Sequence, residues 1–212
     1  MLKEQNGAVL LDLLQGGIDN LEGHRSYLNE LNVFPVPDGD TGTNMLMTLR
    51  YGLAGVKDVP AEAGVCAGQF ASAAVFGARG NSGVIFSQFF KGIAEELACH
   101  REIESSTVAR ALSTGCRLAY SAVAKPVEGT ILTVMREAAA AVAKDTYADL
   151  DALLSAYLDA ARASLARTPD LLPVLKKAGV VDSGAAGLVC FFEGVQKRLR
   201  GEQILKENAA PA

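Results

Sequence analysis

The sequence predicts an all-α fold, in which about eight helices pack antiparallel in one large domain. Apolar residues recur at three- and four-residue steps through most of the chain, which is the period of a helix with one buried face. No stretch alternates apolar and polar residues between hairpin-type turns, so a β-sheet is not expected. The connections between the periodic segments are short, which favours antiparallel packing of neighbours.

The helices follow one another along the whole chain. From first to last, we expect them at residues 7–22, 44–56, 61–77, 83–98, 106–124, 130–144, 147–167 and 183–200. Pro60, Pro126 and Pro169 fall between these segments, where a helix end tolerates proline. The domain is therefore placed at residues 1–200, and residues 201–212 are interpreted as a tail or linker toward further domains.

Composition and charge exclude several classes of protein. Half of the 212 residues are hydrophobic and 21% are charged, which is typical of a folded domain and not of a disordered chain. The formal net charge is −4 and no basic stripe is visible, so a nucleic-acid partner is not expected. Four widely spaced cysteines form no CxxC pair and predict reduced thiols. The N-terminus has no long apolar run, so we expect a cytoplasmic protein without a membrane span.

The irregular stretch between Asn32 and Thr43 carries the strongest chemical signal. It contains Asp38 and Asp40 on either side of a glycine, and it enters a helix at about Asn44. Two carboxylates at this spacing can converge on one hard cation such as Mg²⁺, and a helix start attracts phosphate oxygens. An Asx-turn followed by an ordinary helix cap uses the same residue types, and this alternative stays open.

Three further segments place glycine and small polar residues at helix starts. They are Ala78–Gly83, with the sequence ARGNSG, Pro126–Thr130, with the sequence PVEGT, and Val181–Gly187, with the sequence VDSGAAG. In the first, Asn81 and Ser82 are suitable helix caps, and Arg79 could pair with a phosphate or with a surface carboxylate. Helix starts that converge at one end of a bundle would form an electropositive mouth without many lysines.

Common nucleotide-binding and hydrolytic motifs are missing. The sequence has no GxxxxGK[ST] loop and no HRD or DFG motif, which excludes P-loop enzymes and protein kinases. His24 and His100 stand alone, and we interpret both as structural or surface residues.

Taken together, the four segments resemble the nucleotide-binding domain shared by dihydroxyacetone kinases and bacterial fatty acid kinases. The most specific part is LNVFPVPDGDTGTNM at residues 31–45, which is similar to the fatty acid kinase version. ARGNSGVIFSQFFKG, PVEGTIL and VVDSGAAG follow in the family's order. The resemblance implies a barrel of eight antiparallel helices, with ATP and two Mg²⁺ ions bound at one end.

The resemblance also implies roles for individual residues. Asp38 and Asp40 would hold the metal ions, with Asn32 in place of a third aspartate, and Asp38, Asp40 and Arg79 would be catalytic. The nucleotide-binding residues that it implies are Thr41, Gly42, Thr43, Asn44, Asn81, Ser82, Gly83, Gly129, Thr130, Asp182 and Gly184.

The function implied by the resemblance is phosphoryl transfer from ATP. Similarity to fatty acid kinases implies that a fatty acid carboxylate, presented by a separate lipid-carrying protein, is converted to an acyl phosphate. Two alternatives remain: the nucleotide-binding subunit of a dihydroxyacetone kinase, and a nucleotide-binding scaffold without turnover. The acceptor, its chain length and the oligomeric state are not predicted.

Overall fold

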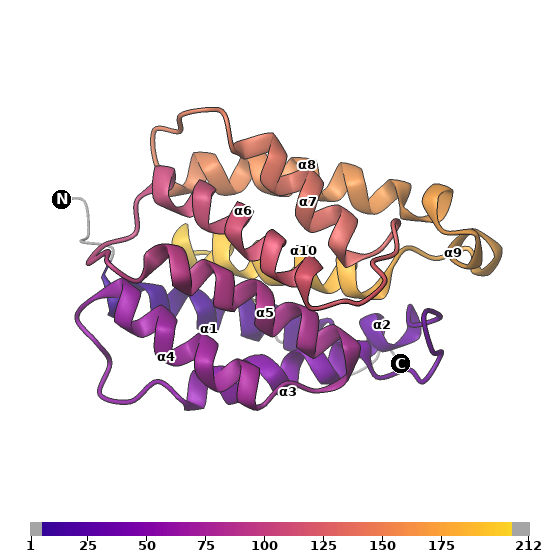
Figure 1. Cartoon of the computed structure of the whole chain (residues 1–212), viewed down its shortest axis with the longest axis horizontal. Coiled ribbons are helices and arrows are strands. Elements are labelled where there is room, and N and C mark those ends of the chain that lie inside the picture. Colours follow the sequence, from indigo (N-terminus) through magenta and orange to yellow (C-terminus); the bar gives the residue numbers. More distant parts are fainter. Residues whose placement is uncertain (1–5, 205–212) are drawn as a thin grey trace.

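The computed structural model describes residues 6–204, and these residues form α-helices and no β-strand (Figure 1). The helices are α1 (Gly7–Gly23), α2 (Arg25–Glu30), α3 (Thr41–Ala54), α4 (Ala63–Phe76), α5 (Gly80–Leu97), α6 (Ser105–Ser121), α7 (Ile131–Val142), α8 (Leu150–Leu171), α9 (Pro173–Ala178) and α10 (Ser183–Leu199). Eight of them are long and correspond one by one to the expected helices. The all-α prediction is confirmed, and the two six-residue helices α2 and α9 are additional.

The long helices run up and down and close into a ring. Each packs against the next along the chain, from α3 through α8, and α10 then packs against both α8 and α1 (Figure 1). Contacts of α1 with α3 and α4 close the ring. Because neighbours are antiparallel, α3, α5, α7 and α10 all begin at the same end of the bundle, on the right in Figure 1.

Helix α10 is the most deeply buried element. Its Phe191 and Phe192 stack edge-on with each other, and they contact Phe86 of α5 and Tyr157 of α8 with ring centroids 5.5 Å and 4.8 Å apart. Edge-on aromatic pairs of this kind add to the hydrophobic stabilisation of a core. An apolar pocket of about 80 Å³ also lies between α1, α4, α5, α6, α8 and α10.

The expected end of the seventh long helix is wrong. Pro60 and Pro126 lie in connections as predicted, but Pro169 lies inside α8, which continues to Leu171. Proline has no N–H to donate to the carbonyl four residues earlier, which here belongs to Leu165. The hydroxyl of Thr168 donates to that carbonyl instead, at 2.8 Å, so the helix passes through the proline.

The remaining sequence expectations concern the cysteines, the membrane and the tail. Cys66, Cys116 and Cys190 are buried free thiols and Cys99 is exposed and free. In the described part of the chain, no helix combines the length and the apolar character needed to cross a bilayer. Residues 205–212 of the predicted tail lie outside the described residues.

Candidate functional site

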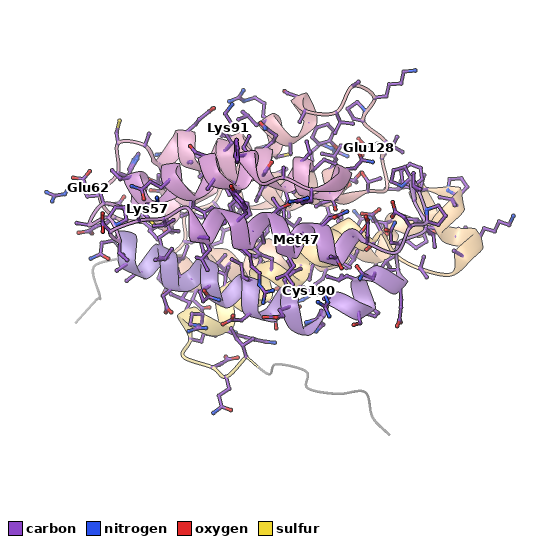
Figure 2. All side chains as sticks on the ribbon, turned by 90° about the horizontal axis from the view of Figure 1, so that it is seen from below. Met47, Lys57, Glu62, Lys91, Glu128 and Cys190 are labelled. Carbon is purple, nitrogen blue, oxygen red and sulfur yellow. The ribbon has the colours of Figure 1, made fainter. Side chains whose placement is uncertain are left out.

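A cleft of about 520 Å³ opens at the end of the bundle where α3, α5, α7 and α10 begin. It lies at the same end as Glu128, far from Lys57 and Glu62, which occupy the other end (Figure 2). Its walls come from all four segments that the sequence singles out. A cleft of this size accommodates a ligand as large as a nucleotide.

The cleft exists because α3 and α7 stand apart. Helix α3 packs against α5 and α10, and α7 packs against α6 and α10, whereas α3 and α7 share no packing interface within residues 6–204. The connection 32–40 and the start of α3 therefore form one wall. The connection 122–130 and the start of α7 form the other, and the starts of α5 and α10 lie between them.

The loop before α3 is organised by the amide of Asn32. This buried side chain donates from Nδ2 to the carbonyl of Val36 at 3.0 Å, and its Oδ1 accepts from the N–H groups of Asp40 and Thr41 at 3.1 and 3.3 Å. These bonds occupy the amide oxygen that metal binding would need. The structure therefore gives Asn32 a loop-holding role, and its role as a metal ligand stays a prediction.

Asp38 and Asp40 both line the cleft, Asp38 exposed and Asp40 half-buried. No basic side chain of residues 6–204 forms a salt bridge with either carboxylate. The same residues contain no group of three or more His, Cys, Asp or Glu side chains that could enclose a metal ion. Mg²⁺ is commonly bound by one or two carboxylates together with water and substrate phosphates. The two unpaired carboxylates fit such an ion.

Helix α3 begins three residues earlier than expected, at Thr41 and not at Asn44. The reason is that amide side chains from outside the helix bind its first N–H groups. Asn32 binds those of Asp40 and Thr41, and Asn29 of α2 accepts from the N–H of Thr43 at 3.1 Å. Asn29 also donates to the Thr43 hydroxyl at 3.0 Å, so that hydroxyl faces α2.

The start of α5 differs from that of α3, because its first N–H groups are free. Helix α5 begins at Gly80 with Arg79 as its N-cap, so Asn81 and Ser82 are not caps as predicted but lie in the first turn. No acceptor within the described residues takes a hydrogen bond from the N–H groups of Gly80, Asn81 or Ser82, and all three residues line the cleft. Unbonded N–H groups at a helix start form an anion-binding site.

Gly80 is required for this turn. Its φ of +58° is in the left-handed region, and an added Cβ would lie 2.4 Å from the Nδ2 atom of Asn44. The absence of a side chain lets the starts of α3 and α5 approach each other. Asn44 and Gly80 therefore line the same cleft.

The wall opposite the aspartates is held by Glu128. Its Oε2 accepts from the Thr133 hydroxyl and from Arg136, each at 2.7 Å, and its Oε1 accepts from the Tyr120 hydroxyl at 3.2 Å. The connection 122–130 is thereby fixed to both α6 and α7. It contributes Val127, which lies in the PVEGT segment, and also Val123 and Lys125, which lie outside all four predicted segments.

Asp182 ties two helix starts together. Its Oδ2 caps α10 by accepting from the N–H of Ala185 and also accepts from the N–H of Ile131 in α7, both at 2.9 Å. Burial raises the pKa of Asp182 to about 6, although these two hydrogen bonds oppose the rise. The residue lines the cleft at its base, between the two walls.

The structure brings ten predicted site residues to the cleft. They are Asn32, Asp38, Asp40, Thr41, Asn44, Asn81, Ser82, Thr130, Asp182 and Gly184. The other predicted residues support its walls from behind or beside it: Arg79 is exposed at the α5 cap, and Gly42, Thr43, Gly83 and Gly129 are covered by neighbouring chain. Their ligand-binding roles stay predictions.

Comparison with known proteins shows the family of the chain and its fold. The family model described as the DAK2 domain matches residues 35–197. Protein YloV of Bacillus subtilis is 42% identical over the whole of this chain, which covers 39% of YloV, and an uncharacterized protein of Staphylococcus epidermidis is 44% identical, with 38% covered. The chain thus spans about two fifths of the length of these relatives.

Two solved structures share the fold. Native dihydroxyacetone kinase of C. freundii superposes with a TM-score of 0.65 at 21% identity, over 90% of this chain and 34% of the kinase. The same kinase in complex with AMP-PNP and Mg²⁺ superposes with a TM-score of 0.64 at 18% identity, over 93% of this chain and 35% of the kinase.

Proposed function

This chain belongs to the DAK2 domain family, and from that premise we propose that it is the ATP-binding domain of a Mg²⁺-dependent kinase. The single observation that carries the proposal is the shared cleft. Two unpaired carboxylates and a helix start with free N–H groups line the same opening. These are complementary partners for a divalent cation and for the phosphates that it accompanies.

The protein groups would act by positioning the nucleotide and by offsetting charge. The N–H groups of Gly80, Asn81 and Ser82 would donate to phosphate oxygens, and Asp38 and Asp40 would hold Mg²⁺. Bound Mg²⁺ would neutralise negative charge on the transferring phosphoryl group. Phosphoryl transfer needs little covalent work from side chains, so a cleft whose described lining includes no Cys and no His suits this chemistry.

For the acceptor, we propose a fatty acid carboxylate presented by a lipid-carrying protein, which would become an acyl phosphate. Apolar side chains at the cleft support an apolar acceptor: Val36, Val84 and Val127 line it and are exposed by 55, 41 and 39%. A dihydroxyacetone kinase subunit and a scaffold without turnover are the competing proposals. A kinase using ATP fits the cytoplasmic location that the sequence predicts.

Calorimetric titration of ATP with and without Mg²⁺ tests the site. Asp38→Asn removes one charge at the cleft and should weaken binding of ATP with Mg²⁺ by at least about tenfold, because it removes a charged metal ligand. Binding of ATP in EDTA should change little. Asp145→Asn is the matched control, since Asp145 is exposed in the connection between α7 and α8 at the opposite end. Equal affinities of wild type and Asp38→Asn for ATP with Mg²⁺ would refute the metal assignment.

A transfer assay separates the three proposals. Labelled ATP is incubated with the full-length protein and either a fatty acid on its carrier protein, dihydroxyacetone, or no acceptor. Label from the γ-phosphate should appear in an acyl phosphate, which hydroxylamine converts to an acyl hydroxamate with release of the labelled phosphate. Label in a triose phosphate would favour the dihydroxyacetone kinase proposal, and binding without transfer would favour the scaffold.

A further inference from the structure

We propose that Lys125 is a phosphate-binding residue of this cleft, pairing its ammonium group with the phosphate chain held at the start of α5. The inference rests on the proposed nucleotide site and adds to it a residue in none of the four motifs. Lys125 belongs to the connection 122–130 and follows Ala124 along the cleft wall.

The charge of the cleft is the first argument. Three carboxylates line it, Asp38, Asp40 and Asp182, whereas Lys125 is the one basic side chain among its lining residues in the described chain. A polyphosphate entering this surface meets repulsion unless cations offset it. Metal ions would do so beside Asp38 and Asp40. On the opposite wall, Lys125 is the group that can supply positive charge.

The register of α5 and α6 gives the second argument. These antiparallel helices touch at their glycines, where a Cβ on Gly92 would lie 2.6 Å from the Cα of Gly115. From this contact toward the cleft, the same number of residues leads along α6 from Gly115 to Ala122 and along α5 from Gly92 to Ile85. Ala122 and Ile85 therefore lie at the same level, and both line the cleft. Helix α6 ends at Ser121, so the connection that carries Lys125 begins at this level of the bundle. Lys125 lines the same cleft as Gly80, Asn81 and Ser82.

The backbone that carries Lys125 is fixed, and the ammonium end of its side chain is available to a ligand. Glu128 anchors the connection through Tyr120, Thr133 and Arg136. The Lys125 side chain is exposed, and within residues 6–204 no carboxylate lies in salt-bridge range of its ammonium. A flexible four-carbon stem on a fixed base can reach an anion without a large loss of backbone entropy.

The test is a series of calorimetric titrations with adenosine, AMP, ADP and AMP-PNP, all with Mg²⁺. Lys125→Met keeps most of the length of the side chain and removes its charge. It should bind adenosine as the wild type does and should bind AMP-PNP about tenfold more weakly, with the loss starting at the phosphate that Lys125 contacts. Lys125→Arg should retain most of the affinity. Lys91→Met, an exposed lysine on α5 away from the cleft, controls for net charge (Figure 2).

The outcomes separate the two proposals. If the wild type binds none of the four ligands, the nucleotide site itself is wrong. If the wild type binds AMP-PNP and Lys125→Met matches it, or if Lys125→Met loses as much affinity for adenosine as for AMP-PNP, the role of Lys125 is overturned and the site stands.

Discussion

One carboxylate oxygen of Asp182 accepts hydrogen bonds from the starts of two helices, and burial makes ionisation of this carboxyl group unfavourable. Its hydrogen bonds to Ile131 and Ala185 fix the starts of α7 and α10 relative to each other, at the base of the cleft. Both bonds need an acceptor oxygen and not a charge. The charge is disfavoured by burial, which is why the pKa of Asp182 rises from its ordinary value of 3.8 to about 6.

The raised pKa predicts a specific dependence of stability on pH. Between about pH 4 and pH 6, the folded chain keeps a proton on Asp182 that the unfolded chain has released. Stability from this residue is therefore present below pH 4 and lost as pH rises through 6. Asp182→Asn keeps the acceptor and cannot ionise. As the pH rises from 4 to 7, the free energy of unfolding of Asp182→Asn minus that of the wild type should increase by up to about 3 kcal/mol.

Urea unfolding of both proteins at several pH values measures this difference. Subtracting one curve from the other removes the titration of all groups that the two proteins share. A difference that stays constant over this range would show that Asp182 has an ordinary pKa in the folded chain. A difference of the opposite sign would show that its hydrogen bonds outweigh its burial.

At this scale, the sequence predicted which residues gather but not what each one does. Asp38, Asp40, Asn81 and Ser82 were identified as neighbours of one ligand, and they do line one cleft. The structural role of Asn29 was missed because a single amide in a helix carries no pattern. Its bonds to Thr43 form only when α2 folds against α3, which is a tertiary event.

Among the elements, α5 and α6 form one of the closest helix pairs in the bundle. The pair depends on glycine at the crossing, since a Cβ on Gly115 would lie 2.6 Å from the carbonyl oxygen of Phe89. The obstacle is main chain and cannot rotate away. Helix α1 approaches α10 in the same manner through Gly16 and Gly194. Small residues at the contacts explain how a chain without Trp fills its interior.

We predict that Gly115→Ala destabilises the fold although alanine is the better helix former. Forcing a methyl group into this contact should cost about 1–3 kcal/mol, more than the gain in helix propensity. Gly68 is the matched control. It lies inside α4 with nothing within 4 Å of the added Cβ, so Gly68→Ala should stabilise by about 0.5–1 kcal/mol.

Thermal unfolding of the two variants decides the point. The midpoint should fall for Gly115→Ala by at least about 2 °C and should rise for Gly68→Ala. Equal midpoints in the two variants would mean that α5 and α6 separate at little cost.

Helix boundaries show where sequence patterns are sufficient and where they fail. The eight long helices were predicted to within a few residues, because each buries a periodic apolar face. Helices α2 and α9 have six residues each, too short for periodicity to be visible. Helix α9 nevertheless has local signals that could have identified it, since Pro173 is its first residue and Gly179 ends it in the left-handed conformation.

At the scale of the molecule, the bundle separates a structural end from a candidate functional end. Antiparallel packing sends four helix starts to one end, and the cleft lies there. The opposite end holds three connections, which lead into α4, α6 and α8 (Figure 1). The sequence alone predicts part of this difference between the two ends. Glycine-rich helix starts alternate along the chain with ordinary connections, so in an antiparallel bundle the glycine-rich starts fall at one end. That the four entries face one opening depends on ring closure by α10, which no local pattern reveals.

This difference between the two ends predicts how hydrogen exchange responds to the nucleotide. Binding of AMP-PNP with Mg²⁺ bridges segments that are far apart in sequence, so it should slow amide exchange in all of them together. The protected segments should be 38–44, 80–86, 122–132 and 182–187. The connections at the other end lie away from the cleft, so we expect their exchange not to change. These controls are residues 55–62, 98–104 and 143–149.

The comparison needs three samples: the protein with Mg²⁺ alone, with AMP-PNP and EDTA, and with both ligands. If the carboxylates hold the metal and the α5 start holds the phosphates, EDTA should release segment 38–44 first and leave some protection at 80–86. Protection of only one segment would place the ligand outside the cleft. Equal protection at both ends would indicate general stabilisation of the fold, and the bridging of four helix starts would then be wrong.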